Sequence, residues 1–213
     1  TPLGFVTPWL TRIAFVPSFD SHRELIRFDI ESLAQIPALP GHKFVFAHIV
    51  APHPPFVFDA AGNPLQPDYP FSFNDASDFP KSDEAYREGY VGQVQFVNAQ
   101  LKPLIETILR KSKTPPIIIL QADHGPGMLT DFQSSENTCL RERFSPFAAY
   151  YLPGADEAAI PDDITPVNLF RIIFNQSFST SLEILPARHY YYSGVHIYRG
   201  EDVTSRVDTC VTP

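Results

Sequence analysis

The sequence has 213 residues, of which 44% are hydrophobic and 19% are charged, so it has the composition of a folded chain with a packed core. Its formal net charge is −8 and it has no cluster of lysines and arginines, which argues against a nucleic-acid partner. No apolar run reaches the ~20 residues that a membrane-spanning helix needs. This length suits one α/β domain or one large piece of a bigger protein, and the start at Thr1 indicates an excised or processed segment.

The N-terminal part of the chain is expected to form loops followed by a helix. Prolines interrupt residues 1–21, so we expect loops there with one short helix near residues 10–15. Residues 21–38 carry apolar side chains at helical spacing, and Ser21 with Glu24 has the form of a capping box.

A strand, a long loop and the longest helix are expected next. Residues 43–50, KFVFAHIV, are apolar and rich in β-forming side chains, which predicts a strand. Residues 59–81 are polar and rich in proline and aromatic residues, as in a binding loop or a lid. An apolar stripe predicts a helix over residues 82–113, with Ser82 as its N-cap and Pro103 as a point where it kinks or splits.

The second half begins with an apolar run at residues 117–120, which is typical of a strand buried on both faces. Residues 128–143 are expected to form an exposed loop and residues 147–152 another strand. A helix is expected over residues 162–178, with Thr165 as its cap.

The order of these elements predicts the fold class α/β, with a mainly parallel sheet flanked by helices in a single domain. The remaining residues, including 195–197, are expected to form short strands and turns. The strands at residues 43–50 and 116–121 are both apolar throughout and are separated by a long helix. We therefore expect them to be neighbouring, parallel and buried.

An acidic residue and a histidine follow the apolar strand at residues 117–120. Asp123 and His124 stand at its carboxyl end, where open α/β sheets bind their ligands. Gly125 and Gly127 then leave room for a tight turn or for a close approach. Carboxylate and imidazole form a ligand pair for zinc or manganese. The alternative is a polar junction in which Asp123 only caps a turn.

Histidines also accompany the strand predicted at residues 43–50. His53 follows it among three prolines, which restrict the backbone and suit a rigidly presented side chain. His53 is therefore a candidate site residue, although a histidine of this kind often has only a structural role. His48 lies within the strand, and the alternation of side chains can point it into the packing of the sheet.

Cys139 and Cys210 are the two cysteines of the chain, and their spacing fits no CxxC motif for metal or redox chemistry. They form either one disulfide, which implies an oxidising compartment, or two free thiols. Because neither lies in an apolar run, where a buried thiol would belong, we favour the disulfide.

Four blocks together resemble the sulfatase-like branch of the alkaline phosphatase superfamily, which includes arylsulfatases, phosphoethanolamine transferases and lipoteichoic acid synthases. The blocks are, in order, a strand followed by HIVAPHPPF, the helix YVGQVQFVNAQLKPLIETIL, the strand and turn IIILQADHG, and RFSPFAAYYLPG. The resemblance covers residues 43–154, with weaker similarity toward the C-terminus.

The resemblance implies a metal-dependent hydrolase or transferase that acts on phosphate or sulfate esters. It assigns a divalent metal, zinc or manganese, to Asp123 and His124, and places His53 at the phosphate or sulfate of the substrate. Arg141 is expected to bind this anionic ester as well. A metal would neutralise developing charge and activate a hydroxyl nucleophile, while an imidazole would donate to the anion or the leaving group.

The nucleophile of this family, and a further acidic metal ligand, lie in an N-terminal half. Only 42 residues precede the strand at residues 43–50, and they do not match that arrangement. The resemblance therefore implies the C-terminal half of a sulfatase-like protein, which binds metal weakly and does not turn over alone. Members are commonly membrane-anchored with an extracytoplasmic catalytic domain, which agrees with a disulfide; the alternative location is cytoplasmic.

Two other interpretations remain open at the level of sequence. The chain is either a non-catalytic binding or structural descendant of this fold, or a small-molecule-binding α/β domain unrelated to sulfatases. If the catalytic interpretation is right, Asp123, His124 and His53 should converge on one pocket at the carboxyl edge of the sheet.

Overall fold

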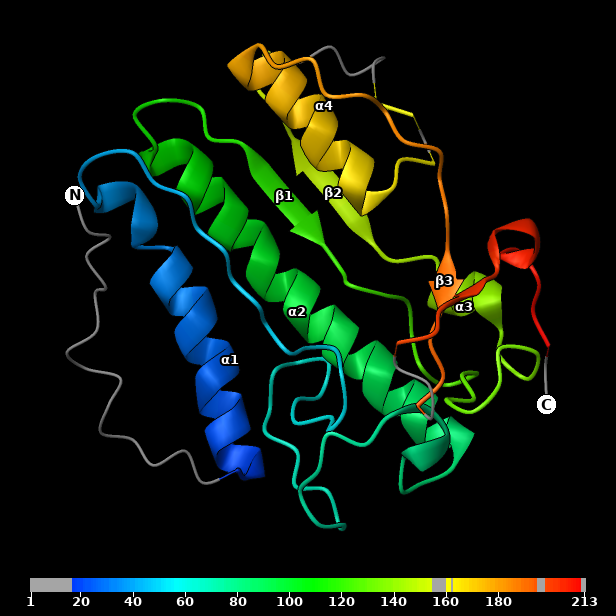
Figure 1. The fold of residues 1–213 in the computed structure, drawn as a ribbon. Coiled ribbons are helices and arrows are strands. Elements are labelled where there is room, and N and C mark those ends of the chain that lie inside the picture. The colour runs from blue at the N-terminus through cyan, green and yellow to red at the C-terminus, as the bar shows by residue number, and fades with distance from the viewer. Residues whose placement is uncertain (1–16, 155–159, 162, 195–197, 212–213) are drawn as a thin grey trace. The chain divides into compact units, whose positions relative to one another are not determined.

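The computed structural model describes residues 17–154, 160–161, 163–194 and 198–211 (Figure 1). The short helix expected near residues 10–15 and the strand expected at residues 195–197 lie outside these ranges. The chain divides into two compact units. The first unit comprises residues 1–74 and 80–108, and the second comprises residues 75–79 and 109–213.

Helix α1, Phe19–Leu33, opens the described part of the first unit. Its N-cap is Ser18, whose side chain accepts a hydrogen bond from Ser21 N, while Ser21 Oγ accepts one from Ser18 N. The capping box is thus formed by Ser18 and Ser21, and its prediction at Ser21 and Glu24 was three residues too late. A short 3-10 helix, Ile36–Ala38, follows α1.

Helix α2, Asp83–Lys111, is the longest element. Ser82 Oγ accepts a hydrogen bond of 3.3 Å from Ala85 N, which confirms Ser82 as the residue that caps the first turn. Pro103 lies inside the helix and does not split it. Both Pro103 and Ala99, whose carbonyl loses its usual donor, are exposed, so water can replace the missing hydrogen bond.

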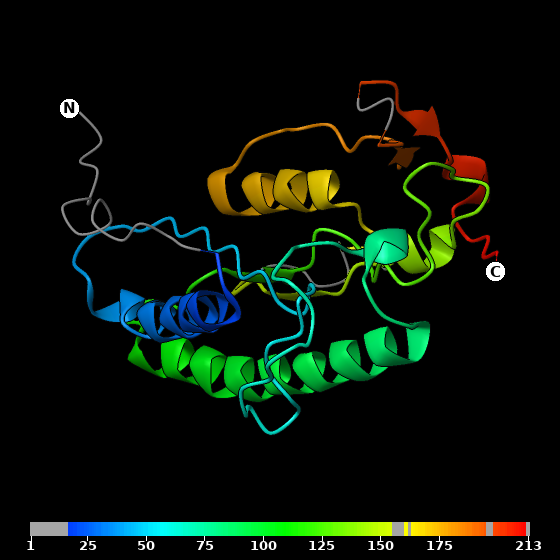
Figure 2. The same ribbon diagram turned by 90° about the horizontal axis from the view of Figure 1, so that it is seen from below.

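Helices α1 and α2 lie side by side in both views (Figures 1 and 2). Apolar side chains from both helices and from the segment after residue 55 form the core of the first unit. Phe58 stacks on Phe96 with 4.1 Å between the ring centroids, and the Arg27 guanidinium lies over the Phe58 ring. The buried members of this core are Ile26, Ile30, Val57, Phe58, Phe96, Val97 and Leu104.

Residues 43–50 form no strand, and the prediction of a buried strand there is wrong. Phe44 and Phe46 are 88% and 82% exposed. An apolar run becomes a buried strand only where a partner strand and a covering layer are available. In the described structure this segment has no partner strand, and only its end, at Ile49, packs against the core. The predicted parallel pairing with residues 116–121 is not seen in the described residues.

Both sheets of the described second unit are antiparallel pairs of strands. Strand β1, Ile118–Gln121, pairs with β2, Ala148–Tyr151, so the strands predicted at these two places are confirmed. All four residues of β1 are only partly buried, so the prediction that it is buried on both faces is wrong. Strand β3, Tyr190–Tyr191, pairs with β4, Glu201–Asp202. A mainly parallel sheet is thus not seen in the described residues.

Helix α4, Pro166–Phe178, lies beside the β1–β2 pair (Figures 1 and 2). Thr165 caps it by accepting from Asn168 N, and Pro166 occupies its first turn, as predicted. Helix α3, Leu140–Arg143, stands where the sequence predicted only a loop. Two 3-10 helices, Ala76–Asp78 and Thr204–Arg206, complete the described second unit. None of the helices in the described ranges is long and apolar enough to cross a membrane.

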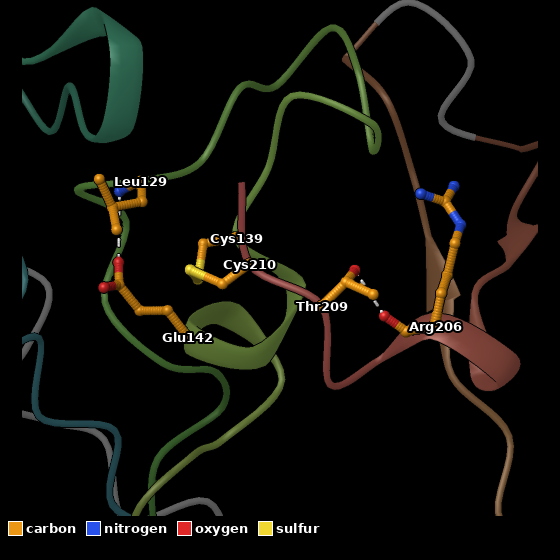
Figure 3. The surroundings of a disulfide bond; sticks show 6 residues. All are labelled: Leu129, Cys139, Glu142, Arg206, Thr209 and Cys210. Atoms are coloured by element: carbon orange, nitrogen blue, oxygen red, sulfur yellow. Dashed lines mark hydrogen bonds between the residues drawn. A yellow bond between two sulfur atoms is a disulfide. The ribbon is translucent and has the colours of Figure 1, made fainter. Parts of the chain in front are cut away.

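Cys139 and Cys210 form a disulfide, which confirms the favoured alternative for the two cysteines (Figure 3). Cys139 is the residue just before α3 and is 98% buried, being only 2% exposed. Next to the disulfide, Arg141 N donates a hydrogen bond of 3.0 Å to Thr209 O. The C-terminal segment is therefore attached to the start of α3 by both a covalent bond and a backbone hydrogen bond.

Breaking this disulfide should destabilise the protein. The bond closes a loop with a sequence separation of 71 residues, which corresponds to about 4 kcal/mol in the chain-entropy model. Urea unfolding of the wild type, with and without a reductant, should show a difference of this order. The double variant Cys139→Ala, Cys210→Ala should match the reduced protein and no longer respond to the reductant; a persisting response would contradict the prediction.

The stability of the first unit should fall at acidic pH because of His22. This residue is 1% exposed, and its burial, followed by the effect of nearby His53, lowers its pKa from 6.5 to about 4. The unfolded state then binds more protons than the folded state between these two pKa values. The contribution of His22 to the free energy of unfolding is therefore present above pH 6.5 and is lost as the pH falls toward 4. Between pH 7 and pH 5 this loss amounts to about 2 kcal/mol.

Urea unfolding at pH 7 and pH 5 measures this loss. His22→Gln should remove most of the difference between the two pH values, because Gln does not titrate. His42→Gln, at an exposed histidine, is the matched control and should keep the wild-type difference. An unchanged pH dependence in His22→Gln would contradict the assignment.

Candidate metal centre

Asp123 and His124 lie in the turn that follows β1. Ala122 N donates a hydrogen bond of 2.8 Å to Phe147 O, which continues the pairing of β1 and β2 by one residue. The chain then leaves the sheet, with Asp123 exposed and His124 partly buried. The sequence therefore placed this pair correctly, at the carboxyl end of a strand.

The side chains of Asp123 and His124 present two metal-ligating atoms side by side. His124 N donates to Asp123 Oδ1 at 3.1 Å, and His124 Nδ1 lies 2.9 Å from Gly125 O. Because a carbonyl only accepts, Nδ1 carries the proton and Nε2 of the neutral ring keeps its lone pair. This Nε2 lies 3.4 Å from Asp123 Oδ2.

The separation of these two atoms fits a shared metal ion. Two ligand atoms that each lie about 2.0–2.1 Å from a tetrahedral zinc are ~3.3–3.4 Å apart. Donor type and separation therefore both suit a divalent cation. In the described ranges, however, no group of three or more His, Cys, Asp or Glu side chains is arranged to hold a metal. The pair thus supplies two ligands, whereas catalytic zinc sites use three protein ligands and a water.

The turn after His124 fits against α3 without room for a side chain. A Cβ on Gly125 would lie 1.8 Å from Glu142 O, and one on Gly127 would lie 2.4 Å from Asp75 Oδ2. Gly125 N also donates to Arg143 O at 2.8 Å. These two glycines are therefore required by close approach, as the sequence suggested.

A cavity of about 1210 Å³ lies beside Asp123 and His124 within the second unit. Its lining combines polar groups with aromatic rings and includes Gln121, Asp123, His124, Arg143, His189 and Tyr191. Burial raises the pKa of Tyr191, so its hydroxyl stays protonated and donates to Asp131 O. The cavity has the mixed polar and aromatic lining of a ligand site, and it is larger than the ~300–1,000 Å³ of most small-molecule pockets.

His53 lies in the first unit, in a segment fixed by a buried glutamine. Gln93 Nε2 donates to His53 O at 3.2 Å, and Gln93 Oε1 accepts from Val57 N at 2.8 Å. His53 Nδ1 lies 2.5 Å from Pro54 O, and the ring makes an edge contact with Phe73. The ring is thus held in place, as expected of a presented side chain. Its convergence with Asp123 and His124 stays a prediction, since these residues belong to different units.

The structure places the other predicted residues as follows. Arg141 is exposed and does not line the cavity, whereas Arg143, two residues later, does. The substrate role of Arg141 stays a prediction. His48 is exposed rather than packed into a sheet.

Sequence reasoning missed two buried charged residues at the turn, Asp75 and Arg143. Asp75 is one of several acids in a polar loop, and Arg143 is one of two arginines in a charged stretch. Nothing in their sequence context separates them from Asp78 and Arg141, which are exposed. The nearest sequence signal was the Gly125 and Gly127 pair, which indicates that something approaches the turn closely.

Asp123 and His124 thus lie where a strand ends, beside a cavity with polar and aromatic lining, which is where α/β folds commonly carry their ligand sites. The sequence model of the Sulfatase family matches residues 21–198, and the chain belongs to this family. The family is one of sulfatase-like hydrolases with the alkaline-phosphatase-like α/β fold, and its members generally use a divalent metal. No curated protein and no solved structure matches the chain significantly.

Adding a methyl group at Gly125 should damage the turn. Gly125→Ala places a Cβ 1.8 Å from Glu142 O, so either the turn or α3 must move, at a cost of about 2–3 kcal/mol. Thermal unfolding measures the loss. Gly92→Ala is the control, since its Cβ would meet nothing closer than 3.5 Å in the middle of α2, and it should be neutral or stabilising. Equal stability of Gly125→Ala and wild type would contradict the close approach.

Proposed function

We propose that the chain is the C-terminal part of a metal-dependent hydrolase or transferase that acts on phosphate or sulfate esters. Asp123 Oδ2 and His124 Nε2 would hold a divalent cation, zinc or manganese, together with ligands from outside this pair. The observation that carries the proposal is their 3.4 Å separation, which fits two ligands of one ion. Membership of the Sulfatase family supports the same conclusion.

The bound metal would supply Lewis acidity toward the ester and toward a hydroxyl nucleophile. The residues of this chain would do the rest of the positioning. In the neutral form of His124, the hydrogen bond from Nδ1 to Gly125 O would leave the lone pair of Nε2 for the metal, and Asp123 would contribute the negative charge. His53 would donate a hydrogen bond to the phosphate or sulfate, and the cavity beside His124 would take the organic part of the ester.

The proposal extends to the complete protein. We place the nucleophile and the further acidic ligand in a segment N-terminal to this chain, and we infer a mainly parallel sheet for the whole catalytic domain; family membership supports both. We also place the domain outside the cytoplasm, attached to a membrane-anchored protein. The Cys139–Cys210 bond supports an oxidising compartment.

Titration of the chain with zinc or manganese, followed by calorimetry and by the NMR signals of His124, tests the metal site. Binding should be saturable but weak, because the described part of the chain supplies two protein ligands. Asp123→Asn should weaken it at least about tenfold, since it removes the anionic ligand. Asp78→Asn, at an exposed acid of the same unit that does not line the cavity, is the control and should bind like wild type.

Two results would count against the proposal. Binding that Asp123→Asn leaves unchanged would place the metal elsewhere. No binding at all would favour a non-catalytic descendant of the family. The chain should also leave a chromogenic phosphodiester, a phosphate monoester and a sulfate ester intact; turnover lost in Asp123→Ala would show that this chain holds a complete site.

A further inference from the structure

A guanidinium and a carboxylate lie largely buried against the turn that carries Asp123 and His124. The side chains of Arg143 and Asp75 are 17% and 7% exposed, and Arg143 Nη1 lies 3.9 Å from Asp75 Oδ2. Charged groups are rarely buried unless a neighbour compensates them. Neither residue is a metal ligand in the proposed function, so metal binding does not explain why their charged side chains are largely buried at this turn.

Arg143 contacts the turn through both its backbone and its side chain. Its carbonyl accepts from Gly125 N at 2.8 Å, and its Nη1 donates to Gly125 O at 3.3 Å. Gly125 O is also the acceptor for His124 Nδ1. Gly125 O thus accepts from both Arg143 Nη1 and His124 Nδ1. With the proton of the neutral imidazole on Nδ1, the lone pair is on Nε2.

Asp75 holds the other end of the same turn. Its carboxylate occupies the space that a Cβ on Gly127 would need, with Oδ2 only 2.4 Å from that position. Asp75 is also the residue just before the 3-10 helix Ala76–Asp78, near the end of the long loop at residues 59–81. The pair therefore contacts both glycines of the turn, Arg143 at Gly125 and Asp75 at Gly127.

We propose that Arg143 and Asp75 are positioning residues, which fix the tautomer of His124 and the separation between its Nε2 and Asp123 Oδ2. The guanidinium keeps Gly125 O in place as an acceptor, so the proton stays on Nδ1 and the lone pair stays on Nε2. The inference deepens the proposed function, on which the metal role of this lone pair rests.

Arginine is required at this position by geometry as well as by charge. The guanidinium reaches Gly125 O and Asp75 while its Cζ lies 5.9 Å from the centroid of the Phe132 ring. Nη1 faces both Gly125 O and Asp75 Oδ2 while the planar group lies near the Phe132 ring, whereas the ammonium of lysine is a compact point charge that cannot stack on a ring in this way. Arg143→Lys keeps the charge and loses this geometry.

The test measures the tautomer of His124 in the metal-free chain by long-range ¹H–¹⁵N NMR at pH 8. Wild type should show the proton on Nδ1. Arg143→Lys and Asp75→Asn should show a mixture of tautomers and shifted amide signals of Gly125 and Gly127. Arg141→Lys in α3 and Asp78→Asn in the 3-10 helix Ala76–Asp78 change exposed residues and serve as controls. Both should keep the wild-type tautomer of His124.

Zinc titration of the same variants gives a second readout. Arg143→Lys and Asp75→Asn should weaken zinc binding by about 10- to 100-fold, as loss of groups that orient metal ligands does. Each variant is first checked for its fold by circular dichroism. If Arg143→Lys does not fold, the isosteric Asp75→Asn decides the question alone.

The outcomes separate this inference from the proposed function. A wild-type tautomer in folded Arg143→Lys and Asp75→Asn, even with lowered thermal stability, would overturn the positioning role. A changed tautomer in the variants would support it. If wild type fails to bind zinc while the variants change the tautomer of His124, the proposed metal function is wrong and the positioning role of Arg143 and Asp75 is supported.

Discussion

The second unit depends on the close contact between the turn after β1 and helix α3. Gly125 N bonds to Arg143 O, and no side chain fits between the turn and the helix at this point. The helix itself is held at its start by the Cys139–Cys210 bond. Strand β1 is thus connected to α3 through the turn, and α3 is connected to the C-terminal segment through the disulfide. Asp123 and His124 lie in the middle of this rigid arrangement. Ligating groups keep a defined separation only when their support is this rigid.

The first unit fixes its candidate residue by different means. His53 lies in neither a strand nor a helix. Its backbone segment is instead held by the side-chain amide of Gln93, which donates to His53 O and accepts from Val57 N and Phe58 N. Gln93 is fully buried, so leaving any of these groups unpaired would be costly. In both units, a residue distant in sequence thus fixes the candidate site residue. Gln93 fixes His53, and Arg143 fixes the turn that carries His124.

Apart from the Cys139–Cys210 disulfide, the features predicted from sequence were those with a local cause. The start of α4 at Thr165 and Pro166 needs only its own residues, and the apolar run before Asp123 specifies β1 wherever a partner is present. Residues 43–50 carry the same apolar signal and form no strand, because a strand also requires a neighbour. Arg143 and Arg141 are equivalent by pattern, and only the docking of α3 makes the first largely buried and leaves the second exposed.

The exposure of residues 43–50 has a consequence for how the isolated chain behaves in solution. FVFAHIV is rich in β-forming residues, contains no proline and carries no acidic or basic residue other than one histidine, which is the composition of segments that assemble into cross-β structure. Lys43 precedes it and Pro52 follows closely, and such flanking residues oppose that assembly. With Phe44 and Phe46 in water, we expect this stretch to promote association of the chain as its concentration rises.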